Sequence, residues 1–177
     1  LDRQKFMKGR VVYGWDQFRS QQAEHFVSSI RATEKPGTYF LHLAVPHYPW
    51  SLLPDGRSYM DDQFSGAASI PGAVEEHWCD DDWPVNLCWQ RNLLQIQYAD
   101  RMLGQVLDKL SESELYDSTM IIVTADHGLA FHSGNEMREL SERTKPDLLS
   151  IPLFIKRPNQ TNGTISDKSV ETIDVLP

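Results

Sequence analysis

The stretch of the chain that decides the fold is TMIIVTADHG, at residues 119–128. The apolar run at residues 120–125 predicts a buried strand with apolar side chains on both faces, which is typical of a parallel sheet. The run leads directly into a carboxylate and an imidazole, Asp126 and His127, and then into Gly128. In parallel α/β sheets, binding sites lie beyond the carboxyl ends of the strands. We therefore expect a functional site at the end of this strand.

The neighbouring segments predict a layered α/β domain. Short apolar runs indicate two further strands, at residues 39–45 and 151–155. Apolar residues recur at helical spacing over residues 15–33 and 90–110, which predicts two helices. The expected apolar face of the second helix consists of Leu93, Ile96, Ala99, Leu103, Val106, Leu107 and Leu110. Strand, long helix and strand in this order form the βαβ pattern of a mostly parallel sheet.

Composition and charge exclude several classes of protein. The chain has 177 residues, of which 40% are hydrophobic and 24% are charged, so it is neither fibrous nor mostly disordered. This length suits one domain with a sizeable core. The net charge of −8 argues against a general binder of nucleic acid or of anionic membranes, because phosphate groups attract Lys and Arg. The chain lacks a run of about 18 apolar residues, the length that a membrane-spanning helix requires.

Most of the net negative charge lies in one long connection, residues 50–88. The connection contains many Pro and Gly residues without a sustained period, so we expect an acidic loop there. Residues 55–88 carry eight carboxylates and one arginine, a net charge of −7. We expect this loop to overhang the functional site and to influence which substrate binds. Its tryptophans either stack on a sugar or pack beneath the loop, and they are Trp78, Trp83 and Trp89.

Chemistry-bearing residues follow two of the predicted strands. A carboxylate next to an imidazole, as at Asp126 and His127, favours zinc or manganese over an all-oxygen calcium site. The alternative is that Asp126 caps the next turn and His127 is a surface residue. His47 lies between two prolines in the segment PHYP, which fixes the backbone at the edge of the sheet. His47 either binds an anionic group or protonates a leaving oxygen, unless the turn is only rigid and the histidine incidental.

Five stretches together resemble the sulfatase branch of the alkaline-phosphatase superfamily. They are YFLHLAVPHYPW, QIQYADRMLGQVLDKL, TMIIVTADHG, LLSIPLFIKRPNQ and ETIDVLP, in the order and spacing of the family. The resemblance extends from about Trp15 to Pro177 and is weakest over residues 50–88. It implies a three-layer α/β/α sandwich of the alkaline-phosphatase-like type with a mostly parallel sheet. It also implies a metal-dependent enzyme that breaks sulfate or phosphate esters.

The resemblance implies roles for individual residues. Asp126 and His127 match the pair of residues that ligates a divalent metal in the family, with Zn, Mn or Ca as the expected ion. His47 matches a histidine that contacts the transferred group. These three residues are therefore the first candidates for the active site.

Three further residues are candidates for binding or catalysis. His132 lies where many family members have another functional histidine, although the usual Gly-x-His-Gly pattern is missing there. It is either a catalytic residue or a local loop residue. Arg138 and Lys145 are candidates for binding the anionic substrate, and the alternative is that they are ordinary solvated side chains.

The nucleophile of the family has no match in this chain. In the family it is a modified Cys or Ser in Cys/Ser-x-Pro-x-Arg, or a Thr in phosphotransferase relatives, and neither Cys79 nor Cys88 fits. These two thiols either form a disulfide, as suits an exported protein, or stay free. We expect the nucleophile and the remaining carboxylate ligands upstream of Leu1. Residues 1–177 would then be part of one catalytic domain and inactive alone, because a metal held by two ligands binds weakly.

The resemblance leads to one expected function and two alternatives. The expected function is hydrolysis of sulfuric esters by a sulfatase-like enzyme. The alternatives are an envelope phosphoglycerol or phosphoethanolamine transferase of the same superfamily, and a catalytically inactive, sulfatase-like binding module. The expected partner is an anionic ester, on a glycan or a lipid-linked headgroup, and not a nucleic acid. The family resemblance favours an extracytoplasmic location.

Overall fold

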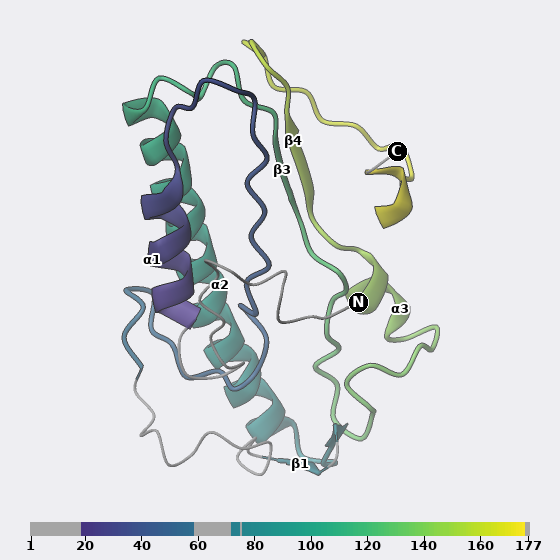
Figure 1. The fold of residues 1–177 in the computed structure, drawn as a ribbon. Helices are drawn as coiled ribbons and strands as arrows, with labels where there is room; N and C mark the ends of the chain where they lie inside the picture. The colour runs from purple at the N-terminus through teal and green to yellow at the C-terminus, as the bar shows by residue number, and fades with distance from the viewer. Residues whose placement is uncertain (1–18, 59–71, 75, 176–177) are drawn as a thin grey trace, which may run out of the picture.

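The computed structural model describes residues 19–58, 72–74 and 76–175. Figure 1 shows two helices side by side and, apart from them, a ribbon of two strands. The helices are α1 (Arg19–Ser29), α2 (Asp82–Glu112), α3 (Lys145–Leu149) and the 3₁₀ helix η4 (Thr172–Asp174). The strands are β1 (Ala73–Val74), β2 (His77–Trp78), β3 (Ile121–Thr124) and β4 (Leu153–Lys156). Within these described ranges, no helix is both long enough and apolar enough to cross a membrane.

Helices α1 and α2 form one layer, which a small apolar cluster holds together. Ala23 of α1 packs with Tyr98 and Met102 of α2, and all three side chains are buried. Leu43 and Val45 are partly buried and pack against the same cluster. The extended stretch that carries them therefore lies on the helical layer, and this contact determines where the following turn emerges.

Helix α2 begins at Asp82 and not at the predicted Gln90, so the end of the expected 50–88 loop is helical. Asp81 is the N-cap, and its Oδ1 accepts a hydrogen bond from the backbone N–H of Trp83 at 2.9 Å. Carboxylates in the first turn also interact favourably with the positive end of the helix dipole. An Asp cap with a proline in the first turn is a helix start signal, although the apolar period begins only later.

The sheet differs from the mostly parallel one that the sequence predicts. Strand β3 pairs with β4 in antiparallel register, from Ile121 opposite Lys156 to Thr124 opposite Leu153. Strands β1 and β2 are also antiparallel, so the described residues contain no parallel ladder. The strand predicted at residues 39–45 is not formed, since this stretch pairs with no described strand, and its Leu43 and Val45 pack instead against the helical layer.

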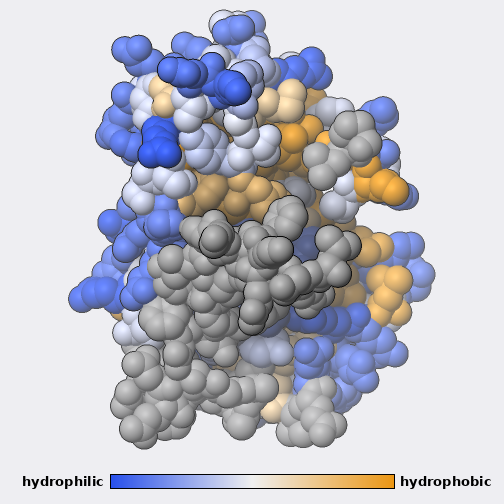
Figure 2. All heavy atoms as spheres, viewed as in Figure 1, coloured by the Kyte–Doolittle hydropathy of each residue, from blue (hydrophilic) through white to orange (hydrophobic). Residues whose placement is uncertain are grey.

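The β3–β4 ribbon is also less buried than a central strand of a layered fold. Ile122 is 37% exposed and Phe154 is 65% exposed, so the predicted burial of both faces is not found. Figure 2 shows apolar surface along this ribbon and between it and the helices. Within the described part of the chain, no helix layer covers these side chains.

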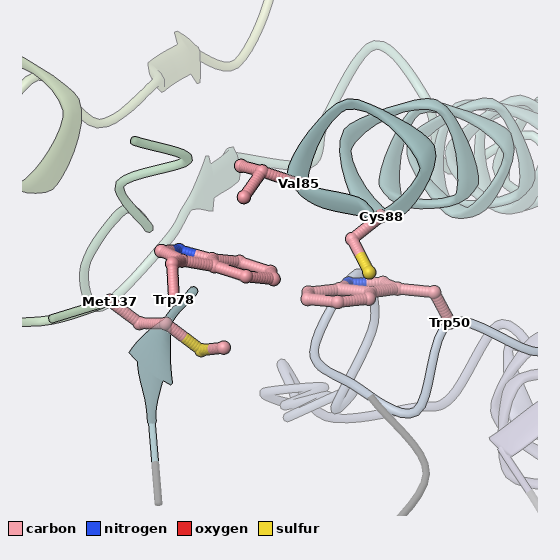
Figure 3. Packing of buried hydrophobic residues seen from close by; sticks show 5 residues of the cluster. All are labelled: Trp50, Trp78, Val85, Cys88 and Met137. Atoms are coloured by element: carbon pink, nitrogen blue, oxygen red, sulfur yellow. The ribbon is translucent and has the colours of Figure 1, made fainter. Parts of the chain in front are cut away.

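The main apolar core lies at the N-terminal end of α2. Its buried members are Trp50, Trp78, Val85, Cys88 and Met137. The rings of Trp50 and Trp78 stack with centroids 6.2 Å apart and an interplanar angle of 14°. Figure 3 shows the Cys88 thiol beside the Trp50 ring. Neither Cys79 nor Cys88 forms a disulfide with another described residue.

The tryptophans of the acidic segment divide into two groups. Trp78 is completely buried in the main core, where its Nε1–H donates to the carbonyl oxygen of Ala130 at 2.8 Å. Trp83 is 70% exposed and Trp89 is 42% exposed. Trp89 contacts Phe131 edge-on, with ring centroids 5.1 Å apart. The packing interpretation therefore applies to Trp78, whereas the other two present ring surface to solvent.

Candidate functional site

The turn at residues 46–49 carries His47 and is held by polar side chains of both helices. Arg19 of α1 donates from Nη1 to the His47 carbonyl at 2.6 Å and from Nη2 to the Tyr48 carbonyl at 2.7 Å. Gln95 of α2 donates from Nε2 to the His47 carbonyl at 2.9 Å. The helical layer thus holds the backbone of the histidine, which makes its position more precise than a loop alone could.

The Gln95 side chain is completely buried and uses both ends of its amide. Its Oε1 accepts hydrogen bonds from the backbone N–H groups of Ser51 and Leu52, both at 3.2 Å. Its Nε2 donates to the carbonyls of Pro46, at 3.3 Å, and His47. A buried amide without partners is costly, and these four contacts satisfy it. They explain why a polar residue lies in the core beside the turn.

The buried face of α2 therefore differs from the predicted apolar face. Asn92 and Gln95 are buried, whereas Leu93 is 38% exposed and Ile96 is 41% exposed. Asn92 donates from Nδ2 to the Pro46 carbonyl at 3.2 Å. Hydrophobic spacing marks only apolar residues, so it gave no sign of these two positioning side chains.

The His47 ring contacts the guanidinium of Arg138, which lies 91 positions later in the chain. Nε2 of His47 is 2.9 Å from Nη2 of Arg138, and Nδ1 is 2.7 Å from the Tyr48 carbonyl oxygen. A guanidinium only donates and a carbonyl only accepts, so these two contacts require the neutral tautomer with its proton on Nδ1. The structure thus brings together two residues that the sequence indicates separately as anion contacts.

Asp126 and His127 lie just after β3, and both are exposed. Oδ2 of Asp126 and Nε2 of His127 are 3.7 Å apart. Oδ1 of Asp126 accepts a hydrogen bond from the backbone N–H of His127 at 2.9 Å. This local contact therefore uses Oδ1, whereas Oδ2 is the oxygen that lies near the His127 ring. Nδ1 of His127 donates to the Gly128 carbonyl at 2.7 Å. This bond places the ring proton on Nδ1 and leaves the lone pair on Nε2, as in many metal-binding histidines.

The spacing of these two atoms fits a shared metal ion. Ligands at about 2.0–2.2 Å from one ion lie no more than about 4.4 Å apart, and the observed 3.7 Å is within this limit. Asp126 and His127 therefore fit two positions of a metal site. In the ranges that the structure describes, no group of three or more His, Cys, Asp or Glu side chains could hold an ion. A complete site needs further ligands.

His132 pairs with Asp147, a residue that the sequence analysis does not indicate. Nε2 of His132 and Oδ2 of Asp147 are 2.7 Å apart, and the two side chains are 30% and 40% exposed. The pair lies beside the candidate metal ligands, because the backbone N–H of Gly128 donates to the Leu148 carbonyl at 2.9 Å. Asp147 and His132 are 15 residues apart, and no spacing rule links them.

Lys145 is not joined to either histidine pair. It begins α3 and is exposed, and its backbone N–H donates to the Ser141 carbonyl at 2.8 Å. Within the described residues, its side-chain amine makes no hydrogen bond or ion pair. The structure therefore adds nothing to the sequence-based case for this residue.

Comparison with known proteins identifies the family. The family model described as Sulfatase matches residues 2–177. The chain belongs to the sulfatase family. A protein named Sulfatase from Formosa agariphila is 27% identical over 101 residues, which cover 54% of this chain and 20% of that protein. Lipoteichoic acid synthase from Staphylococcus aureus is 24% identical over 147 residues, which cover 78% of this chain and 20% of the synthase.

Membership of the sulfatase family confirms the resemblance and implies the α/β fold of the alkaline-phosphatase superfamily. The described residues of this sulfatase-family chain contribute helices and a small antiparallel ladder. They do not themselves form a three-layer sandwich. The matched region spans about a fifth of the length of both relatives.

Proposed function

We propose that the protein carrying this chain is a metal-dependent hydrolase of sulfate esters. The observation that carries the proposal is the exposed Asp126–His127 pair after β3, with Oδ2 and Nε2 3.7 Å apart. The sulfatase family match over residues 2–177 supports this class of reaction. We place the nucleophile outside residues 1–177, which form part of one catalytic domain in this proposal.

The metal is a divalent ion held in part by Asp126 and His127. A carboxylate with an imidazole favours zinc or manganese, and calcium stays an alternative. When bound, such an ion neutralises the oxygens of the transferred group and lowers the pKa of the nucleophile. His127 is prepared for this role, because its Nδ1 proton is already engaged by the Gly128 carbonyl.

The pair of His47 and Arg138 supplies the binding of the anionic group. Arg138 donates one N–H to His47, and a guanidinium has five N–H donors in a planar fork. The remaining donors suit two oxygens of a sulfate or phosphate group at once. His47 holds the guanidinium in place, and Lys145 adds a positive charge on α3. His132 is the residue that contacts the leaving oxygen or the transferred group.

A second function has a specific observation in its favour. The match to lipoteichoic acid synthase covers 78% of this chain, against 54% for the match to the Formosa protein. A phosphoglycerol or phosphoethanolamine transferase would use the same Asp126–His127 pair and the same anion contacts. The nucleophile distinguishes the two, because a modified Cys or Ser indicates a sulfatase and a Thr indicates a transferase. A third possibility is an inactive binding module, which would lack that nucleophile.

The substrate is an anionic ester on a glycan or on a lipid-linked headgroup. The exposed rings of Trp83 and Trp89 are suited to pack on a sugar face, which supports a glycan. The family resemblance and the two named relatives support an extracytoplasmic location. The charge of the acidic segment does not oppose an anionic substrate, since a bound metal would dominate the field at Asp126.

The test uses the full-length protein loaded with zinc, manganese or calcium. We expect hydrolysis of para-nitrophenyl sulfate, and loss of both turnover and bound metal in Asp126→Ala. The matched control is Asp167→Ala, an exposed carboxylate remote in sequence from the site, which keeps both. Retained turnover in Asp126→Ala would refute the proposal. Release of glycerol phosphate from phosphatidylglycerol vesicles, without sulfate release, would establish the transferase instead.

A further inference from the structure

Helix α3 is fixed against the loop that carries the candidate metal ligands. The backbone N–H of Gly128 donates to the Leu148 carbonyl at 2.9 Å. A Cβ atom added to Gly128 would lie 1.7 Å from the carbonyl oxygen of Asp147, so the backbone of α3 lies directly on this glycine. Thr144, the N-cap of α3, is 1% exposed. The backbone at Asp147 is therefore held against Gly128, the residue that follows His127.

The contact between Asp147 and His132 determines which nitrogen of the ring carries a proton. Nε2 of His132 lies 2.7 Å from Oδ2 of Asp147. An ionised carboxylate only accepts, so the proton of this bond belongs to Nε2. No described residue forms a hydrogen bond with Nδ1 of His132. Nδ1 is thus the ring atom that is left for a substrate.

The other two histidines of the site have the opposite arrangement. Nδ1 of His47 donates to the Tyr48 carbonyl at 2.7 Å, and Nδ1 of His127 donates to the Gly128 carbonyl at 2.7 Å. Both rings therefore present Nε2 as an acceptor. His132 is turned the other way, because its Nε2 meets the Asp147 carboxylate at 2.7 Å, a shorter distance than the 3.7 Å between Asp126 and Nε2 of His127.

We propose that Asp147 is a positioning residue that holds His132 as the proton donor of the reaction, an inference that rests on the proposed function. In the step, Nδ1–H of the doubly protonated ring gives its proton to the leaving oxygen. The nucleophile, which the proposed function places outside residues 1–177, bonds to the sulfur (or to the phosphorus in a transferase) as the S–O (or P–O) bond breaks. The electron pair of the broken bond stays on the leaving oxygen, which takes the proton and becomes a hydroxyl. His132 is left neutral, and its Nε2–H still donates to Asp147.

The experiment compares Asp147→Ala, Asp147→Asn and Asp147→Glu in the full-length protein, with Asp167→Asn as the control. General acid catalysis contributes about 10²–10⁴-fold, so we expect kcat to fall about 100-fold or more in Asp147→Ala with little change in KM. Asp147→Glu, which keeps a carboxylate, should recover part of kcat. Asp167→Asn should keep the kcat of the unaltered protein.

A second readout reports on the ring and is independent of turnover. Nitrogen NMR of histidine-labelled protein, with the His132 signals assigned through His132→Ala, should show the Nε2 proton of His132 only when residue 147 accepts from it. The signals should change in Asp147→Ala and stay unchanged in Asp167→Asn. Unchanged ring signals or an unchanged kcat in Asp147→Ala would overturn the inference. An unaltered protein that cleaves neither ester class overturns the proposed function, and the ring signals then decide the positioning separately.

Discussion

The close approach of α3 to Gly128 makes a quantitative prediction for Gly128→Ala. The added methyl would lie 1.7 Å from the Asp147 carbonyl oxygen and 2.9 Å from its carbonyl carbon. Both are backbone atoms that cannot rotate away, so α3 must retreat by about 2 Å to reach an ordinary contact distance. Overpacking of this kind costs about 1–3 kcal/mol. Loss of the hydrogen bond from Gly128 to Leu148 adds about 1 kcal/mol.

We therefore expect Gly128→Ala to lower the free energy of unfolding by about 2–4 kcal/mol. The assay is equilibrium urea unfolding followed by tryptophan fluorescence, which reports on the stacked Trp50 and Trp78 rings. The matched control is Gly104→Ala within α2, where an added Cβ meets nothing within 4 Å. Ala is the better helix former, so the control should be more stable by about 0.5–1 kcal/mol. The reasoning fails if the two variants unfold at the same urea concentration.

A substitution, a labelling experiment and the dependence of stability on pH test the packing beside the site. Gln95→Leu should lower the free energy of unfolding by about 1–3 kcal/mol, because it removes the acceptor of the Leu52 backbone N–H and one of the two acceptors of the Ser51 N–H. The exposed Gln97→Leu is the control, and an equal effect in both variants would contradict the role of Gln95. Burial raises the pKa of the Cys88 thiol from 9.0 to about 11. Since the thiolate is the reactive form, iodoacetamide should modify Cys79 before Cys88 in the native protein at pH 8, and mass spectrometry would detect the order. The same shift means that stability is full below pH 9 and declines as the pH rises through about 11, because the unfolded chain loses this proton first.

Local sequence signals predicted where the helices and strands lie better than they predicted which strands pair. The apolar period of residues 90–110 indicates α2, and the run at residues 120–125 indicates β3, because each signal arises within one element. Pairing direction depends on contacts between distant segments, and periodicity carries no information about it. Periodicity therefore could not predict that β3 pairs with β4 in antiparallel register, or that residues 39–45 stay unpaired.

The candidate site shows the same division. Asp126 and His127 are adjacent in the chain, so one motif was enough to place their donor atoms within 3.7 Å. The contact of His47 with Arg138 joins residues 91 positions apart, and only the folded backbone brings them together. Gln95 was hidden for a different reason, since a buried polar residue is recognisable only once its partners are known.

The contacts of the Gln95 amide have a consequence for how this protein can diversify. They attach to α2 both the backbone of His47 and the two residues that follow the turn, Ser51 and Leu52. Insertions and deletions between Ser58 and Gly72 can then accumulate without shifting the histidine. Over evolutionary time, that segment is free to change in length and composition as new esters are selected, while the reacting groups keep their geometry. In such an arrangement, substitutions that change the range of substrates leave the chemistry of the site unaltered.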